Sequence, residues 1–166
     1  MAEKKSVFKT ILDAVTVLLA VLLIAFVALP YIGYSVGGKT MSDANLSGYD
    51  CISFEEGAPV ATAVVLVMLL IFASLLIISA IAKILIDLGI IKSEKVAKIV
   101  KAVMILSAVL SAILAIASIF TVAVYCGDHY SSELNTGLVP MFATLVINAI
   151  IAVVTIVTTA ISAKKQ

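Results

Sequence analysis

The sequence predicts an all-α fold, a bundle of four transmembrane helices that forms a single domain over residues 1–166. Two observations predict it: hydrophobic residues make up 63% of the chain and charged residues only 13%, and the apolar residues gather in four long runs. A bilayer core of about 30 Å takes roughly 20 apolar residues in a helix, and each run is that long. With their flanking residues, the helices are expected at about 7–29, 59–88, 94–125 and 137–163.

Residues typical of helix ends stand where these helices are expected to begin and end. Pro59 and Pro140 lie near the starts of the second and fourth helices, where proline is tolerated because first-turn N–H groups have no helical partner. Gly89 is expected to end the second helix, since glycine readily adopts the left-handed conformation common at that position. Ser93 followed by Glu94 indicates the start of the third helix.

The long first extracellular loop, about 30–58, contains two short segments with strand character. Residues 31–36 precede Gly37 and Gly38, and residues 51–54 follow later in the loop. Segments of this kind separated by glycines can pair as a small β-hairpin, which is the one non-helical element that we expect.

The lysines set the expected orientation in the membrane. Ten of the eleven lie at the termini or between the second and third apolar runs, in the segment 83–101, and only Lys39 lies on the other side. Loops rich in lysine stay in the cytoplasm, so we expect a multi-pass protein of the plasma (cytoplasmic) membrane with both termini cytoplasmic. The outer side instead carries six acidic residues and all five tyrosines, whose rings suit the headgroup zone. The ten lysines are Lys4, Lys5, Lys9, Lys83, Lys92, Lys95, Lys98, Lys101, Lys164 and Lys165.

The only two cysteines, Cys51 and Cys126, both fall on the outer side. Thiols on the oxidising face of a membrane can form a disulfide, which here would tie the long loop to the outer end of the third helix. The alternative is that both stay free.

Four charged residues lie near the cytoplasmic ends of the expected helices. Asp13 follows Lys9 by four residues, and Asp87 follows Lys83 by the same spacing. The spacing favours interfacial charges that pair along one helix. An acid inside a membrane span is also a default candidate for a proton or cation site, which is the alternative for Asp13.

Small and polar residues mark the faces on which the helices are expected to pack. Ser107, Ser111 and Ala115 recur every four residues on the third helix, while Asn148 and Thr155 lie on the fourth. Small residues in such rows let helices approach closely, and a buried amide must find a partner on another helix. The alternative is that these polar side chains line a pore.

No arrangement of residues indicates catalysis or a cofactor. We find no nucleophile–base pair, no phosphate-binding loop and no nucleic-acid motif, so we expect no enzyme activity, no cofactor and no nucleic-acid partner. The segment Cys126-Gly127-Asp128-His129 brings three possible metal ligands together, but a structural zinc site usually needs four. We therefore expect a polar loop there and no metal site.

The plan of cytoplasmic termini, a long first outer loop and a short second one resembles the tetraspan class, which includes claudins and tetraspanins. The resemblance covers the whole chain as topology only. The tryptophan-containing loop pattern of claudins and the Cys-Cys-Gly of tetraspanins are missing, since the chain has no Trp and Cys51 is alone in its loop. No functional residue is carried over from that class.

The sequence is consistent with two functions. The first is a non-enzymatic membrane interaction or assembly protein, acting as a homo-oligomer or as a small subunit of a membrane complex, with the lipid bilayer as its surroundings. The second is a subunit of an oligomeric pore, channel or small transporter, in which Ser107, Ser111, Asn148 and Thr155 line the path.

Overall fold

The structure, a computed structural model, is mostly helical. It describes residues 2–36, 39–53, 59–129 and the helical residues 146–147, 149–151, 153–154 and 157. Its elements follow the order α1 (Ala2–Phe26), β1 (Pro30–Val36), β2 (Lys39–Ser47), α2 (Gly48–Ile52), α3 (Val60–Asp87) and α4 (Glu94–His129).

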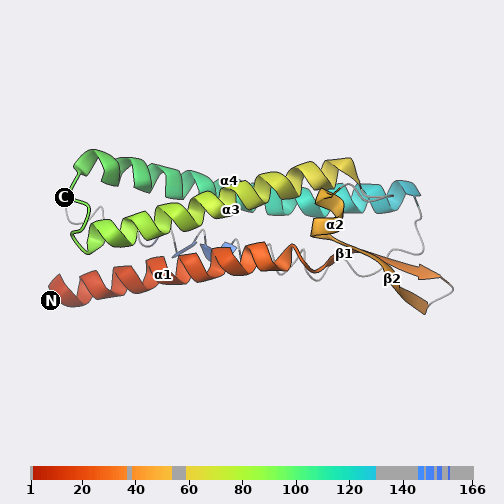
Figure 1. Ribbon diagram of the computed structural model, residues 1–166, viewed down its shortest axis with the longest axis horizontal. Coiled ribbons are helices and arrows are strands. Elements are labelled where there is room, and N and C mark those ends of the chain that lie inside the picture. The colour runs from red at the N-terminus through yellow and green to blue at the C-terminus, as the bar shows by residue number, and fades with distance from the viewer. Residues whose placement is uncertain are drawn as a thin grey trace.

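Three long helices lie side by side, with the two strands and the short helix α2 gathered at one end (Figure 1). The helix α3 packs against both α1 and α4. The stretches long and apolar enough to cross a membrane are Val7–Phe26, Val60–Asp87 and Glu94–Tyr125. The expected fourth helix, 137–163, lies mostly outside the described residues, so the four-helix bundle stays a prediction.

The boundaries of α3 confirm the expectation closely, and α4 continues past residue 125 to His129. The first helix is displaced: α1 begins at Ala2 and ends at Phe26, three residues before the expected end. Beyond Phe26 the chain tightens, because Ala28 N–H donates to the Ala25 carbonyl at 3.0 Å, a three-residue spacing. Leu29 precedes Pro30, and a residue before proline disfavours the helical conformation.

The turn between α3 and α4 follows the sequence prediction. Gly89 has a φ of 75° and donates to the Ile86 carbonyl at 2.9 Å, while Ile90 donates to the Leu85 carbonyl at 3.0 Å. These two bonds form the Schellman motif that satisfies the last carbonyls of a helix. Ser93 starts α4, since its Oγ accepts from the Val96 N–H at 3.5 Å.

The hairpin forms, but with a different second strand. β1 pairs antiparallel with β2, from Val36 opposite Lys39 to Pro30 opposite Ser47. The predicted partner, 51–54, was wrong, because Cys51 and Ile52 belong to α2. A capping box starts this helix: Ser47 Oγ accepts from the Asp50 N–H at 3.2 Å, and the Asp50 carboxylate accepts from the Ser47 N–H at 2.6 Å.

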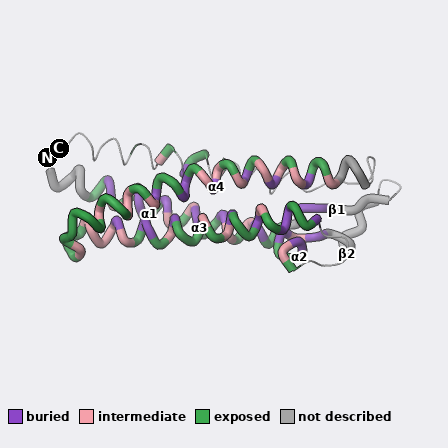
Figure 2. The backbone as a smooth tube through the Cα atoms, turned by 90° about the horizontal axis from the view of Figure 1, so that it is seen from above, coloured by how far each residue is buried: buried purple, intermediate pink, exposed green. Residues whose placement is uncertain are grey.

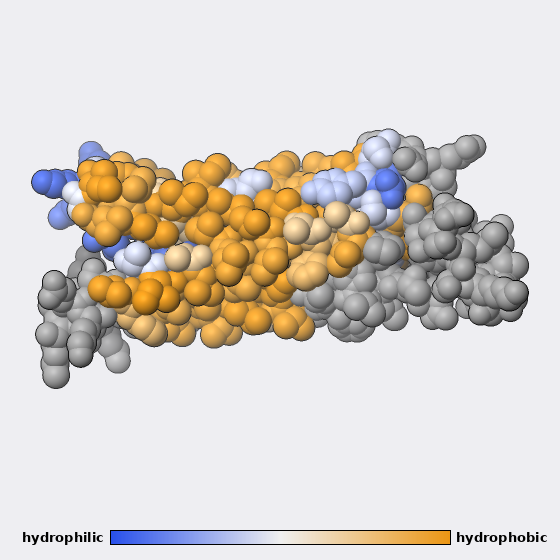
Figure 3. Space-filling view, turned by 60° about the horizontal axis from the view of Figure 1, so that its bottom comes forward, coloured by the Kyte–Doolittle hydropathy of each residue, from blue (hydrophilic) through white to orange (hydrophobic). Residues whose placement is uncertain are grey.

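Two apolar clusters hold the helices together. The outer cluster joins the hairpin and α2 to the ends of the long helices nearest to them, and the inner cluster joins the long helices to one another. Buried positions face the interior of the bundle and exposed ones face outward (Figure 2), and the described part of the face seen in Figure 3 is largely apolar. The outer cluster contains Leu23, Tyr31, Ile32, Leu46, Cys51, Leu66, Leu69, Ala73 and Val122, and the inner cluster contains Ala20, Leu76, Ala80, Met104, Ala108 and Ile151.

We predict that Gly48→Ala destabilises the hairpin end of the protein. A Cβ at Gly48 would lie 2.6 Å from the Val27 carbonyl oxygen, a backbone atom that cannot step aside. Moving α2 to relieve this clash would cost roughly 1–3 kcal/mol, as for other overpacked sites. The measurement is thermal unfolding in detergent, with Gly89→Asn as the control. Gly89 has open space around it, and asparagine tolerates its positive φ. Equal unfolding midpoints for the two variants would contradict the close packing.

Candidate functional site: an ion pair between α1 and α3

An aspartate and a lysine meet in the interior between α1 and α3. Lys83 Nζ donates to both carboxylate oxygens of Asp13, at 2.6 Å and 2.5 Å. Asp13 is fully buried and Lys83 is only 9% exposed. Both residues lie within stretches that are long and apolar enough to cross a membrane. Neither charge could stay there alone, because an unpaired charge in an apolar interior is costly.

This pairing differs from the one that the residue spacing suggested. Lys83 was expected to pair with Asp87 on its own helix, and the structure pairs it with Asp13 across the bundle instead. The physical reason is burial: Lys83 faces α1, where Asp13 would otherwise be an isolated buried charge. A signal was present in the sequence. Asp13 lies near the start of one span and Lys83 near the end of the next, and antiparallel neighbours bring those positions to the same depth.

Because Lys83 pairs with Asp13, the Asp87 carboxylate keeps an oxygen without a hydrogen-bond partner. Its Oδ2 atom is buried and has no hydrogen-bond partner. An unsatisfied buried acceptor costs free energy, so such atoms in native structures call for an explanation. Among the described residues, Asp87 is the one carboxylate with a buried oxygen that has no hydrogen-bond partner.

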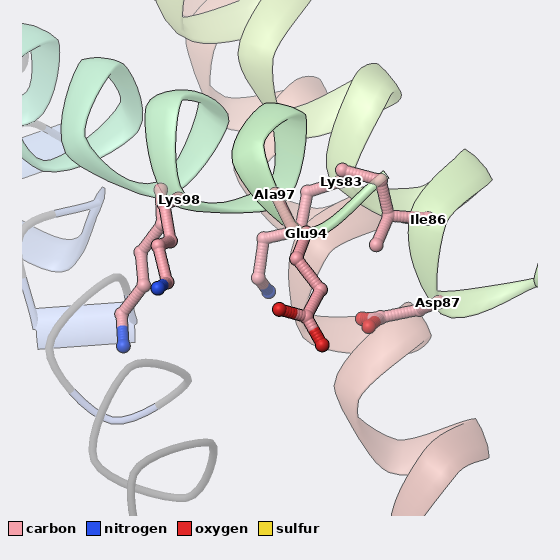
Figure 4. Close-up of a pocket in the computed structure, with 7 residues that line it drawn as sticks. Lys83, Ile86, Asp87, Glu94, Ala97 and Lys98 are labelled. Carbon is pink, nitrogen blue, oxygen red and sulfur yellow. The ribbon is translucent and has the colours of Figure 1, made fainter. Parts of the chain in front are cut away.

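Asp87 lies in the wall of a cavity of about 340 Å³ beside the turn between α3 and α4 (Figure 4). Lys83 and Asp87 were expected as interfacial charges, whereas the part of the wall contributed by α4 was not expected from the sequence. Glu94, Lys98 and Lys101 are four and three residues apart and therefore share one helix face, which was the available signal. The lining residues are Lys83, Ile86, Asp87, Glu94, Ala97, Lys98 and Lys101.

The small-residue row of α4 is buried in the structure. Ser111 and Ala115 are fully buried and Ser107 is 2% exposed. Ser111 Oγ has no hydrogen-bond partner, while Ser118 Oγ donates to the Ala115 carbonyl at 2.7 Å. Further buried hydroxyls come from Thr16 on α1 and Thr62 and Ser79 on α3, and Thr62 donates to Thr121 across α3 and α4 at 3.1 Å. Asn148 and Thr155 lie outside the described residues.

The expected disulfide is not supported. Cys51 is a free cysteine, fully buried in the outer cluster, and the side chain of Cys126 lies outside the described residues. The side chains of the Cys126–His129 segment are likewise not described. Among the residues searched, no group of three or more His, Cys, Asp or Glu side chains comes together to hold a metal ion.

Comparisons with protein-family models, with curated proteins and with solved structures found no match for this chain. The tetraspan resemblance therefore stays a prediction from topology.

We predict that the Cys51 thiol is free and slow to react in the folded protein. Burial, reinforced by the Asp50 charge, raises the pKa of Cys51 to about 11, from 9.0 for a free thiol. The thiolate is the reactive form, so its reaction with a maleimide should be about a hundredfold slower than that of an exposed cysteine and should speed up as pH rises towards 11.

A Cys126→Ser variant leaves Cys51 as the only thiol, and the same variant unfolded in SDS serves as the control. Equal rates in the folded and unfolded states would contradict the burial. Wild-type protein that shows no titratable thiol after unfolding without reductant would establish the bridge instead.

Proposed function

We propose that the protein is a non-enzymatic integral membrane protein, with both termini cytoplasmic, that acts as a subunit of a homo-oligomeric pore or small transporter for protons or small cations. The observation that carries this proposal is the Asp13–Lys83 ion pair inside apolar helices. Ionisable residues within membrane spans are rare and commonly mark ion pathways or proton relays.

The position of Lys83 supports a transfer role for the pair. Its side chain both lines the cavity beside the α3–α4 turn and holds Asp13, so one residue connects the cavity to the buried acid. If the ammonium leaves, the Asp13 carboxylate must take up a proton or a cation, because its unpaired charge is unfavourable in the apolar interior. Movement of the Lys83 ammonium away from Asp13 is therefore coupled to the binding of a proton or a cation by Asp13.

The apolar clusters explain why we propose a subunit and not a pore through one chain. From the ion pair towards the hairpin end, the helices pack through the inner cluster, which includes Ala20, Leu76, Met104 and Ile151. Packed apolar layers exclude water and ions. A path across the membrane then needs helix movement or a seam between copies. An assembly protein without transport is the other function expected from the sequence, and a flux measurement separates the two.

We predict that the ion pair is needed for flux independently of folding. Asp13→Asn or Lys83→Met alone leaves one buried charge uncompensated, which costs about 3–5 kcal/mol. The double variant removes both charges and should recover most of that stability. Wild-type protein in liposomes should carry protons or cations under a membrane potential, read with an enclosed pH dye or cation dye, while the folded double variant should not.

Lys92→Met is the matched control, because Lys92 is exposed and lies just beyond α3. A double variant that transports at the wild-type rate would show that the ion pair has a structural role only. Folded wild-type protein with no flux above empty liposomes would favour the assembly function.

We predict that a cysteine in place of Lys165 is shielded from an impermeant maleimide in intact cells, whereas one in place of Asp43 is labelled. The reason is the lysine asymmetry, which orients the chain with its termini in the cytoplasm. Asp43 lies on β2, at the end of the bundle opposite the N-terminus (Figure 1). Both substitutions are made with Cys51 and Cys126 replaced by serine. Equal labelling at the two positions would contradict the orientation.

A further inference from the structure

We propose that the cavity beside the α3–α4 turn binds a zwitterionic headgroup, a phosphate linked to a primary ammonium, and that phosphatidylethanolamine of the bilayer supplies it. The proposal does not require that the protein transports ions, although the cavity is the one that Lys83 lines. The volume of the cavity, about 340 Å³, falls in the range of small-ligand pockets. The wall of the cavity comes from the end of α3 and the start of α4, which a short turn holds together.

The charges in the wall are separated in a way that matches such a headgroup. The carboxylates of Asp87 and Glu94 point into the same space, and the Lys98 ammonium lies off to one side of them (Figure 4). Lys101, one turn further along α4, adds a second lysine to the wall. A ligand with one positive and one negative group complements this wall better than a simple anion or cation.

The positive half of the ligand is indicated by Asp87. Its Oδ2 atom is buried without a partner and needs a hydrogen-bond donor. Lys83 does not serve, because its ammonium is turned towards both oxygens of Asp13 and forms no hydrogen bond with this Asp87 oxygen. A primary ammonium carries three N–H donors. A trimethylammonium group, as in choline, carries none, and it would leave the Asp87 oxygen unsatisfied.

The negative half is indicated by Lys98 and Lys101. Among the described residues neither of them forms a salt bridge, whereas the charge of Lys83 is balanced by Asp13. Lysine is a common phosphate binder through its point charge. Two lysines on one face of α4 can therefore hold a phosphate while Asp87 and Glu94 hold the ammonium.

The location of the cavity favours a lipid as the source. It lies beside the turn that joins the apolar stretches Val60–Asp87 and Glu94–Tyr125, and the ends of helices that cross a membrane are surrounded by headgroups. Ile86 and Ala97 give the wall an apolar part. The outward faces of α3 and α4 carry exposed apolar side chains, including Ile78, Ile81 and Ile99, along which acyl chains can lie.

The test measures lipid binding to purified protein in detergent by native mass spectrometry. The probes are short-chain phosphatidylethanolamine, phosphatidylcholine and phosphatidylglycerol, together with soluble phosphoethanolamine. The ethanolamine lipid should bind at least about tenfold more tightly than the choline lipid, the effect of one charge-assisted hydrogen bond. Equal binding of these two lipids would overturn the proposal. Soluble phosphoethanolamine that binds as tightly as the lipid would overturn the lipid as its source.

Two variants separate the halves of the site. Asp87→Asn should lower ethanolamine-lipid binding about tenfold and leave phosphatidylglycerol binding unchanged, since that lipid has no ammonium. Lys98→Gln should weaken both lipids, and Lys95→Gln, at an exposed position outside the cavity, should weaken neither. If Asp87→Asn does not fold, Glu94→Gln at an exposed position replaces it. If whichever of these two variants folds binds the ethanolamine lipid as tightly as the wild-type protein does, the proposal is overturned.

Discussion

The arrangement of the long helices depends on one constraint, that a charge within an apolar helix must meet an opposite charge. Asp13 on α1 and Lys83 on α3 satisfy that constraint for each other. The apolar side chains of the inner cluster allow many sliding arrangements of neighbouring helices, because apolar contact has little directionality. A lysine bound to both oxygens of one carboxylate has a single position. The pair therefore sets the depth of α1 relative to α3 and turns both helix faces inward.

At the other end of the molecule the constraint is the backbone, not a charge. The chain leaves α1 at Phe26 and must satisfy its polar groups outside a helix. The β1–β2 hairpin does so by strand pairing, and the capping box of Ser47 and Asp50 does so for the first turn of α2. Hydrogen bonding of Asp50 to Ser47 lowers the pKa of that carboxyl, so the cap is complete at neutral pH and weakens as the pH falls through the folded-state pKa. This end is also held by apolar packing, in which Tyr31, Ile32 and Cys51 share one cluster with Leu23 and Leu66.

The long helices could be predicted from the sequence because their signal is local. Twenty or more consecutive apolar residues, Gly89 and Ser93 each act within their own segment, and α3 and α4 begin within a residue of where they were expected. The second strand was missed because β2 is polar, with Asp43, Asn45 and Ser47, and has no alternation of apolar residues. Polar residues pair well in a strand when the backbone ladder holds them. The Asp13–Lys83 pair was missed for a different reason: its partners are 70 residues apart, and only packing brings them together.

The ion pair also bears on how the chain enters the membrane. During synthesis α1 emerges first and carries Asp13, while Lys83 lies near the end of α3 and is made 70 residues later. An acid near the middle of a helix costs about 2.5–3.5 kcal/mol on insertion scales, and less near an end, so α1 alone enters the bilayer against a penalty. The arrival of α3 removes that penalty. Stable insertion of α1 thus depends on the later insertion of α3.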